Sequence, residues 1–180
     1  VFGGPDNEAA RYALDKGFRP VSYWTTATTW PLWFRSLAGL YNRRCGYLGS
    51  APWAYQDFPD QRLYDADRGI HRVSYPDEFG QPIPTLCWEA HRAGIDDVRY
   101  LEALDRAIAA GKDRLGQPSA PAGLSQALEQ AVAVRQRCFE SISGRWFEYL
   151  CHLPAGQLDR TRRELAEATL AIQSALVPTP

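Results

Sequence analysis

The sequence lacks most of the short motifs that identify common enzyme classes, and it contains no methionine. It has no GxGxxG or GxxxxGKS/T loop for nucleotide phosphates and no GxSxG nucleophile elbow. The three histidines, His71, His91 and His152, are scattered, which excludes an HExxH-type zinc site. We therefore expect no cofactor and no metal. Because the chain opens at Val1 without a methionine, we expect it to be a piece of a longer protein.

An excess of charge of one sign and long apolar runs are also missing. The 20 basic and 21 acidic side chains give a net charge of −1, without the basic excess typical of nucleic-acid binding. No run approaches the roughly 20 apolar residues that cross a bilayer. We expect neither nucleic acid nor a membrane as a partner. The cysteines form no CxxC pair, which favours buried free thiols: Cys45, Cys87, Cys138 and Cys151.

The sequence is rich in aromatic residues, at 12%, and its first 85 residues are also rich in Gly and Pro. Asp6 can cap a helix over 7–16, and the apolar run over 19–25 predicts a buried strand. Pro31 predicts the start of a second helix, and the aromatic run over 47–56 predicts a second strand. This alternation of strands and helices is typical of βαβ units in a parallel sheet.

The second part of the chain predicts three helices. Apolar residues recur every three or four positions, as on helices that bury one face, over 85–112, 124–142 and 158–176. The loop over 114–122 is rich in Gly and Pro and gives the best internal boundary. The predicted organisation is therefore strands and helices over 1–113 and a helical segment packed on them over 114–180.

Carboxylates are plentiful, but few are placed for chemistry. Four aspartates follow the second predicted strand, where they either contact a ligand or make local turns in solvent: Asp57, Asp60, Asp65 and Asp67. The pair Asp77 and Glu78 lies between a proline and a glycine, which predicts an exposed turn. Asp96 and Asp97 are consecutive on a helix and point roughly 100° apart, so they cannot flank one bond together.

Aromatic residues at the strand ends indicate a function more strongly. Tyr23 and Trp24 end the first predicted strand, and Trp53 and Tyr55 end the second, followed by Asp57. Alternation along an extended segment places Trp53, Tyr55 and Asp57 on one face. A sugar ring needs aromatic plates for its C–H face beside groups that hydrogen-bond its hydroxyls. These five residues are the predicted carbohydrate contacts; in the alternative interpretation, one or two of the rings fill the core.

Two segments resemble a known family. "GLYNRRCGYLGSAPWAYQDF" and "VSYPDEFGQPIPTLCWEAHRAGIDDVRYLEAL" are similar to the C-terminal part of the catalytic domain of glycoside hydrolase family 123 and its uncharacterised relatives. Those proteins show W-x-Y after the last barrel strand, then Y-P, then a helix with the pattern P-S/T-x-R-W-E-x-x-R-x-G-x-D/E-D-x-x-Y-L. Here the motifs correspond to Trp53–Tyr55, Tyr75–Pro76 and Pro84–Leu101. The similarity covers roughly residues 37–105, somewhat over a third of the chain.

The resemblance implies an α/β fold, the C-terminal part of a TIM-like (β/α)8 barrel followed by α-helices. It also implies substrate-assisted hydrolysis of β-linked N-acetylhexosamine, specifically N-acetylgalactosamine. The acidic pair of that reaction would lie upstream, so no catalytic residue is expected within this chain. The alternative is a non-catalytic carbohydrate-binding or scaffold protein that retains the barrel. The sequence leaves the linkage and the oligomeric state open.

This chain departs from the family pattern at two positions of the helix motif. Cys87 replaces an Arg and Ala93 replaces an acidic residue, which puts in doubt an ion pair that would brace the helix against the barrel. The other motif residues retain the pattern: Arg92, Gly94, Asp96, Asp97 and Tyr100. We interpret these residues as a structural lock for the helix and assign them no catalytic role.

Overall fold

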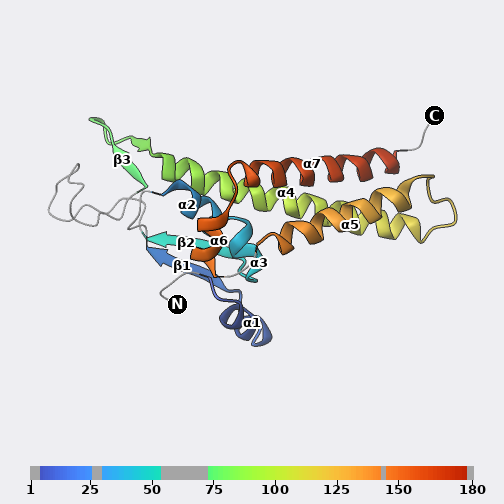
Figure 1. Cartoon of the computed structure of the whole chain (residues 1–180), viewed down its shortest axis with the longest axis horizontal. Helices are drawn as coiled ribbons and strands as arrows, with labels where there is room; N and C mark the ends of the chain where they lie inside the picture. Colours follow the sequence, from blue (N-terminus) through green and yellow to red (C-terminus); the bar gives the residue numbers. More distant parts are fainter. Residues whose placement is uncertain (1–4, 26–29, 54–72, 143–144, 178–180) are drawn as a thin grey trace. The chain divides into compact units, whose positions relative to one another are not determined.

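The computed structural model describes residues 5–25, 30–53, 73–142 and 145–177 (Figure 1). Contacts within the chain divide it into two compact units. Unit 1 comprises residues 1–96 and 146–150, and unit 2 comprises residues 97–145 and 151–180. This division falls inside a long helix, whereas the sequence placed the boundary after residue 113.

The described residues are mostly helical and form two small sheets of two strands each, so the predicted TIM-like (β/α)8 barrel is wrong. Such a barrel needs eight parallel strands. In the described part of the chain one pair of strands is parallel and the other pair is antiparallel. The local alternation of strands and helices does not determine how many strands pair, because pairing depends on contacts between distant segments.

Unit 1 contains the parallel pair and the two helices that connect its strands: β1 (Val21–Thr25), α2 (Pro31–Ala38), α3 (Leu40–Arg44) and β2 (Gly49–Trp53). The order of these elements and the parallel pairing confirm the βαβ unit predicted for this segment. Pro31 begins α2, as predicted. Its fixed φ suits the first helical turn, and a backbone N–H at that position would make no intrahelical hydrogen bond, so its absence costs nothing.

Helices cover one face of the parallel pair. Trp24 of β1 packs edge-to-face on Phe34 of α2, with ring centroids 5.1 Å apart, and both side chains are buried. The first helix, α1 (Asn7–Asp15), precedes β1 and starts where the sequence predicts. The carboxylate of Asp6 caps it by accepting a hydrogen bond from the N–H of Ala9 at 2.9 Å.

An antiparallel hairpin, β3 (Ser74–Pro76) and β4 (Pro82–Pro84), leads into the next helix. The carboxylate of Asp77 orders its turn by accepting hydrogen bonds from the N–H groups of Phe79 at 2.9 Å and Gln81 at 2.7 Å. The predicted exposed turn is therefore present. The strands themselves were not predicted, because three proline-rich residues are too few to show a period-two pattern.

Unit 2 consists of helices. The three predicted helices are observed as α4 (Leu86–Leu115), whose residues 97–115 belong to this unit, α5 (Leu124–Glu140) and α7 (Gln157–Leu176). A short helix that was not predicted, α6 (Trp146–His152), lies between α5 and α7 in sequence.

The helices of unit 2 pack through small and apolar side chains. A Cβ added to Gly111 of α4 would lie 2.7 Å from Cδ2 of Leu128 on α5 and 3.3 Å from Cγ2 of Ile172 on α7. The core between them includes Leu104 and Leu165, which are fully buried. Within the described ranges, no helix combines the length and the apolar character needed to span a bilayer.

Candidate functional site

Two of the predicted aromatic contacts lie exposed on the same face of the β1–β2 sheet. In the parallel register Tyr23 is opposite Ala51 and Thr25 is opposite Trp53, and opposite partners point to one side. The exposed fractions are 40% for Tyr23 and 49% for Trp53. Val21, two residues before Tyr23, shares this face and is also exposed. We refer to Val21, Tyr23 and Trp53 as the exposed sheet face.

Trp24 lies on the opposite, covered face of the sheet. Only 3% of its surface is exposed, and its indole N–H donates a hydrogen bond to Oγ of Ser50 at 2.8 Å. Its ring also lies 6.4 Å from that of His91 on α4. The structure therefore places the Trp24 ring in the core of unit 1, on the opposite face of the sheet from the Tyr23 ring. This agrees with the alternative interpretation, in which one or two of the aromatic rings fill the core.

Tyr55 and Asp57, the other two predicted contacts, lie outside the described residues, as do Asp60, Asp65 and Asp67. The expectation that Trp53, Tyr55 and Asp57 share a face stays a prediction.

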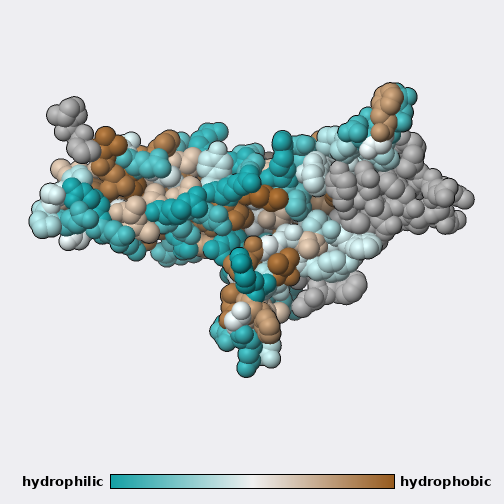
Figure 2. Space-filling view, turned by 180° about the vertical axis from the view of Figure 1, so that it is seen from behind, coloured by the Kyte–Doolittle hydropathy of each residue, from teal (hydrophilic) through white to brown (hydrophobic). Residues whose placement is uncertain are grey.

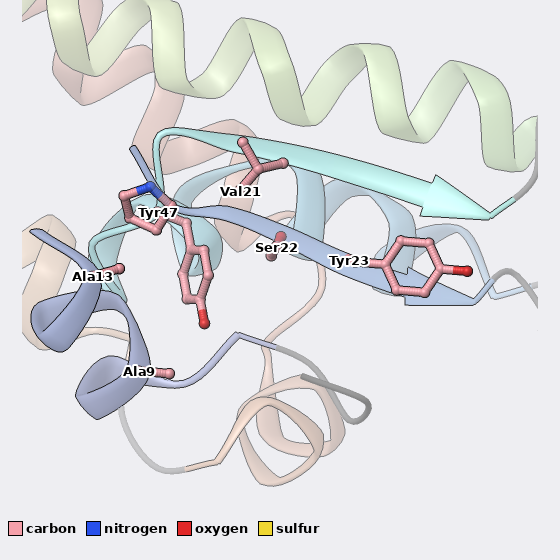
Figure 3. A pocket seen from close by; sticks show the side chains of 7 residues that line it. Ala9, Ala13, Val21, Ser22, Tyr23 and Tyr47 are labelled. Atoms are coloured by element: carbon pink, nitrogen blue, oxygen red, sulfur yellow. The ribbon is translucent and has the colours of Figure 1, made fainter. Parts of the chain in front are cut away.

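A pocket of about 230 Å³ lies between α1 and β1, beside the exposed sheet face (Figure 3). Its lining residues are Ala9, Ala13, Pro20, Val21, Ser22, Tyr23 and Tyr47. Figure 3 shows the Tyr47 ring pointing into the space between the helix and the strand. The Tyr47 hydroxyl accepts a hydrogen bond from the backbone N–H of Asp6 at 3.5 Å. The pocket is thus mostly apolar and shares Val21 and Tyr23 with the exposed sheet face.

Sequence reasoning missed part of this arrangement. It grouped Tyr23 with Trp24, although neighbours in a strand point to opposite faces. The signal was present, because Val21 and Tyr23 alternate with Ser22 and Trp24. No sequence pattern indicated the pocket, because it forms where small side chains of α1 face β1 in the folded chain.

The buried thiols are not suited to nucleophilic chemistry at neutral pH. Burial raises the pKa of Cys45 to about 11 and that of Cys138 to about 11. Burial also raises the pKa of Cys87. Because the thiolate is the nucleophile, these groups are inert near pH 7. Their burial confirms the prediction for three cysteines, whereas Cys151 is exposed.

The charged residues of the family-like helix motif make structural contacts. Asp97 is 1% exposed, and its carboxylate accepts a hydrogen bond from Nε of Arg162 at 2.6 Å. The guanidinium of Arg162 also lies 5.8 Å from the centre of the Tyr100 ring. Glu89 and Arg92, one turn apart, form an ion pair at 2.6 Å. These contacts give structural roles to four residues of the motif and assign them no chemistry: Glu89, Arg92, Asp97 and Tyr100.

His91 of unit 1 is half-buried and lies against two tryptophan rings. Its ring stacks on Trp88, with centroids 6.2 Å apart, and is tilted against Trp24. Its Nε2 is buried and has no hydrogen-bond partner among the described residues. Burial lowers the pKa of His91 from its ordinary value of 6.5, so the ring is neutral at pH 7. The structure therefore gives His91 a packing role.

The described part of the chain offers no group of side chains suited to a metal ion. It contains no cluster of three His, Cys, Asp or Glu side chains placed for this purpose. Cys87 and His91 lie four residues apart on α4 and could face one metal ion, but no third ligand joins them among the described residues.

Comparison with known proteins gives no match: no protein-family model, no curated protein and no solved structure is similar to the chain. The resemblance to glycoside hydrolase family 123 therefore rests on the quoted motifs alone.

Proposed function

We propose that this chain provides a carbohydrate-binding surface, the exposed sheet face, to a glycoside hydrolase-like protein that acts on O-glycosyl bonds. The observation that carries the proposal is the placement of Tyr23 and Trp53 on one face of adjacent parallel strands, 40% and 49% exposed. Large rings gathered at a surface expose apolar area to water, and such patches mark binding sites more often than scattered single residues do.

The chemistry of this face suits a sugar ring. An aromatic ring accepts the apolar C–H side of a pyranose, and a tyrosine hydroxyl can hydrogen-bond its hydroxyl groups. Thr25 is opposite Trp53 and adds a second hydroxyl at the same end of the sheet. Both residues end their strands, and ligands of open parallel sheets bind at the carboxyl ends of the strands. The family-like motifs suggest a β-linked N-acetylgalactosaminide as the ligand.

A second candidate, a carbohydrate-binding protein without catalysis, is favoured by the state of the carboxylates. Asp77 is engaged by two backbone N–H groups of its turn. Asp97 is buried in an ion pair with Arg162. The sequence contains two adjacent acidic pairs, Asp77–Glu78 and Asp96–Asp97. In each pair, one carboxylate thus has a structural role. Under the first candidate, the catalytic acids belong to another part of a longer protein.

Sugar binding can be tested with methyl N-acetyl-β-D-galactosaminide, by saturation-transfer NMR and isothermal titration calorimetry. We expect Trp53→Ala and Tyr23→Ala each to weaken binding by about 1–3 kcal/mol, the value of one buried aromatic contact. Trp53→Phe, which keeps a ring, should retain most of the affinity. Tyr12→Ala is the matched control, because Tyr12 is an exposed tyrosine of α1, at 65%.

Two outcomes would contradict the proposal: no transfer of saturation to the sugar, or an equal loss of affinity in Tyr12→Ala and Trp53→Ala. Hydrolysis separates the two candidates. Release of nitrophenol from 4-nitrophenyl N-acetyl-β-D-galactosaminide supports the hydrolase, whereas sugar binding without release supports the non-catalytic protein.

A further inference from the structure

A second pocket in the described chain, of about 330 Å³, lies between α5 and α7 of unit 2. We refer to it as the α5–α7 pocket. Its wall on α7 is a stripe of residues three or four positions apart, and its other wall comes from the end of α5. The lining includes Gln157, Thr161 and Glu164 on the first wall and Arg137, Cys138 and Ser141 on the second. The pocket shares no residue with the exposed sheet face, which belongs to unit 1.

The α5–α7 pocket is polar, whereas the other buried side chains of the two helices are mostly leucine, isoleucine and alanine. The buried Thr161 hydroxyl accepts a hydrogen bond from Nε2 of Gln157 at 3.3 Å. The Ser141 hydroxyl donates one to the carbonyl of Cys138 at 2.8 Å. Helices that pack only for stability continue their apolar stripe, and departures from it are expected at functional sites. On the face drawn in Figure 2, hydrophilic surface covers much of the helices of unit 2, which suits a polar ligand.

Opposite charges line the two walls of the α5–α7 pocket without pairing. Arg137 and Glu164 are exposed, and neither side chain has a hydrogen-bond or ion-pair partner among the described residues. The Glu164 carboxylate lies near the thiol of Cys138, because burial and Asp97 raise the pKa of that thiol and the charge of Glu164 adds to them. Other pairs of opposite charge between helices of unit 2 are closed: Arg135 with Asp105, and Arg162 with Asp97.

The remaining charged groups at the α5–α7 pocket are already engaged. The carboxylate of Glu140, which also lines it, accepts a hydrogen bond from Nε2 of Gln136 at 2.7 Å. The guanidinium of Arg160, beside the pocket, donates to the carbonyl of Ala155 at 2.9 Å and to Oε1 of Gln157 at 3.1 Å. One guanidinium and one carboxylate therefore stay available to a ligand. The ligand that matches them carries one negative and one positive group, since an anion or a cation alone would leave one wall unpaired.

We propose that the α5–α7 pocket binds a free amino acid in its zwitterionic form. The forked N–H groups of Arg137 donate to the α-carboxylate of the ligand, and the Glu164 carboxylate accepts from its α-ammonium group. Ser141 and Gln157 offer polar atoms to a polar side chain. The volume of about 330 Å³ is near the lower end of the range for small-molecule sites, which suits a ligand of this size. Because every lining residue belongs to unit 2, this inference does not depend on the proposed function.

Titration of the full chain with L-glutamine, followed in ¹H–¹⁵N NMR spectra, tests the binding. We expect saturable shifts of the pocket amides with a dissociation constant of about 1 mM or below. L-Glutaminamide lacks the carboxylate, and N-acetyl-L-glutamine lacks the ammonium group. Each should bind at least about tenfold more weakly, because a hydrogen bond between charged groups is lost. No shifts up to about 20 mM L-glutamine, or equal binding of the three compounds, would overturn the proposal.

Two substitutions assign each end of the ligand to its wall. Arg137→Gln should remove the preference for L-glutamine over L-glutaminamide, and Glu164→Gln should remove the preference over N-acetyl-L-glutamine. Both side chains are exposed, so circular dichroism should show an unchanged helix content. Arg163→Gln and Glu167→Gln are the matched controls, because both residues are exposed on α7 outside the pocket lining, and they should bind as the wild type does. Preferences that survive in the pocket variants, or an equal loss in the controls, would overturn the assignment.

Discussion

Replacing Gly94 by alanine tests the closest approach between two helices of unit 1. A Cβ at position 94 of α4 would lie 3.0 Å from the carbonyl carbon of Arg35 on α2, 3.1 Å from its Cα, and closer still to its carbonyl oxygen. Gly39 meets the same contact, because a Cβ there would lie 2.9 Å from the carbonyl oxygen of Gly94. All of these atoms are backbone, so they can move away only if α2 and α4 separate.

Two opposing terms decide the size of the effect. Alanine is favoured over glycine inside a helix by about 1 kcal/mol, which alone would make Gly94→Ala stabilising. Overpacking costs about 1–3 kcal/mol, and the upper value applies here because the obstructing atoms belong to a helix backbone. We therefore expect Gly94→Ala to reduce the free energy of unfolding of unit 1 by about 2 kcal/mol.

Tryptophan fluorescence during urea denaturation measures this effect, because all six tryptophans belong to unit 1. With a slope of about 2 kcal/mol per molar urea, the midpoint should fall by about 1 M. Gly111→Ala is the control: it lies in unit 2, and its Cβ would meet the flexible end of Leu128 instead of backbone. A Gly94→Ala variant that unfolds at or above the wild-type midpoint would refute this account of the contact.

Three further predictions concern stability. Asp97→Asn should destabilise unit 2 by about 3 kcal/mol, because Arg162 loses its buried partner. Urea unfolding followed by circular dichroism measures this loss. If the losses of Asp97→Asn and Arg162→Met simply add in the double variant, the two residues are not coupled. Burial lowers the pKa of His91 below its ordinary value of 6.5. The contribution of neutral His91 to the free energy of unfolding is therefore fully present above pH 6.5 and is lost as the pH falls through the folded-state pKa. His91→Phe should therefore reduce the fall in the free energy of unfolding as the pH drops below 6.5, and an unchanged slope would assign the dependence to other groups. Trp24→Ala should cost about 3–5 kcal/mol and Trp53→Ala far less, as measured by chemical unfolding; equal losses would place Trp53 in the core.

Much of the local structure could be predicted from the sequence, because its causes lie within a few residues. Asp6 can cap a helix wherever the following backbone is helical, and Pro31 suits a first turn. The stripes over 124–142 and 158–176 need only a partner surface to become the helices α5 and α7. The parallel βαβ unit also followed from the order of its elements. The same reasoning predicted that Tyr23 and Trp53 lie near strand ends, as they do, whereas their role as carbohydrate contacts stays a prediction.

Tertiary structure decided the rest, because it depends on which distant segments meet. The prediction of a barrel was wrong because the number of strands that pair depends on the whole sheet and cannot be inferred from any single strand. Trp24 became a core residue because α2 and α4 cover its side of the sheet, while Tyr23 points the other way. Asp97 and Arg162 are separated by 65 positions, so no local pattern joins them. The pocket likewise exists only because folding brings small side chains of α1 beside β1.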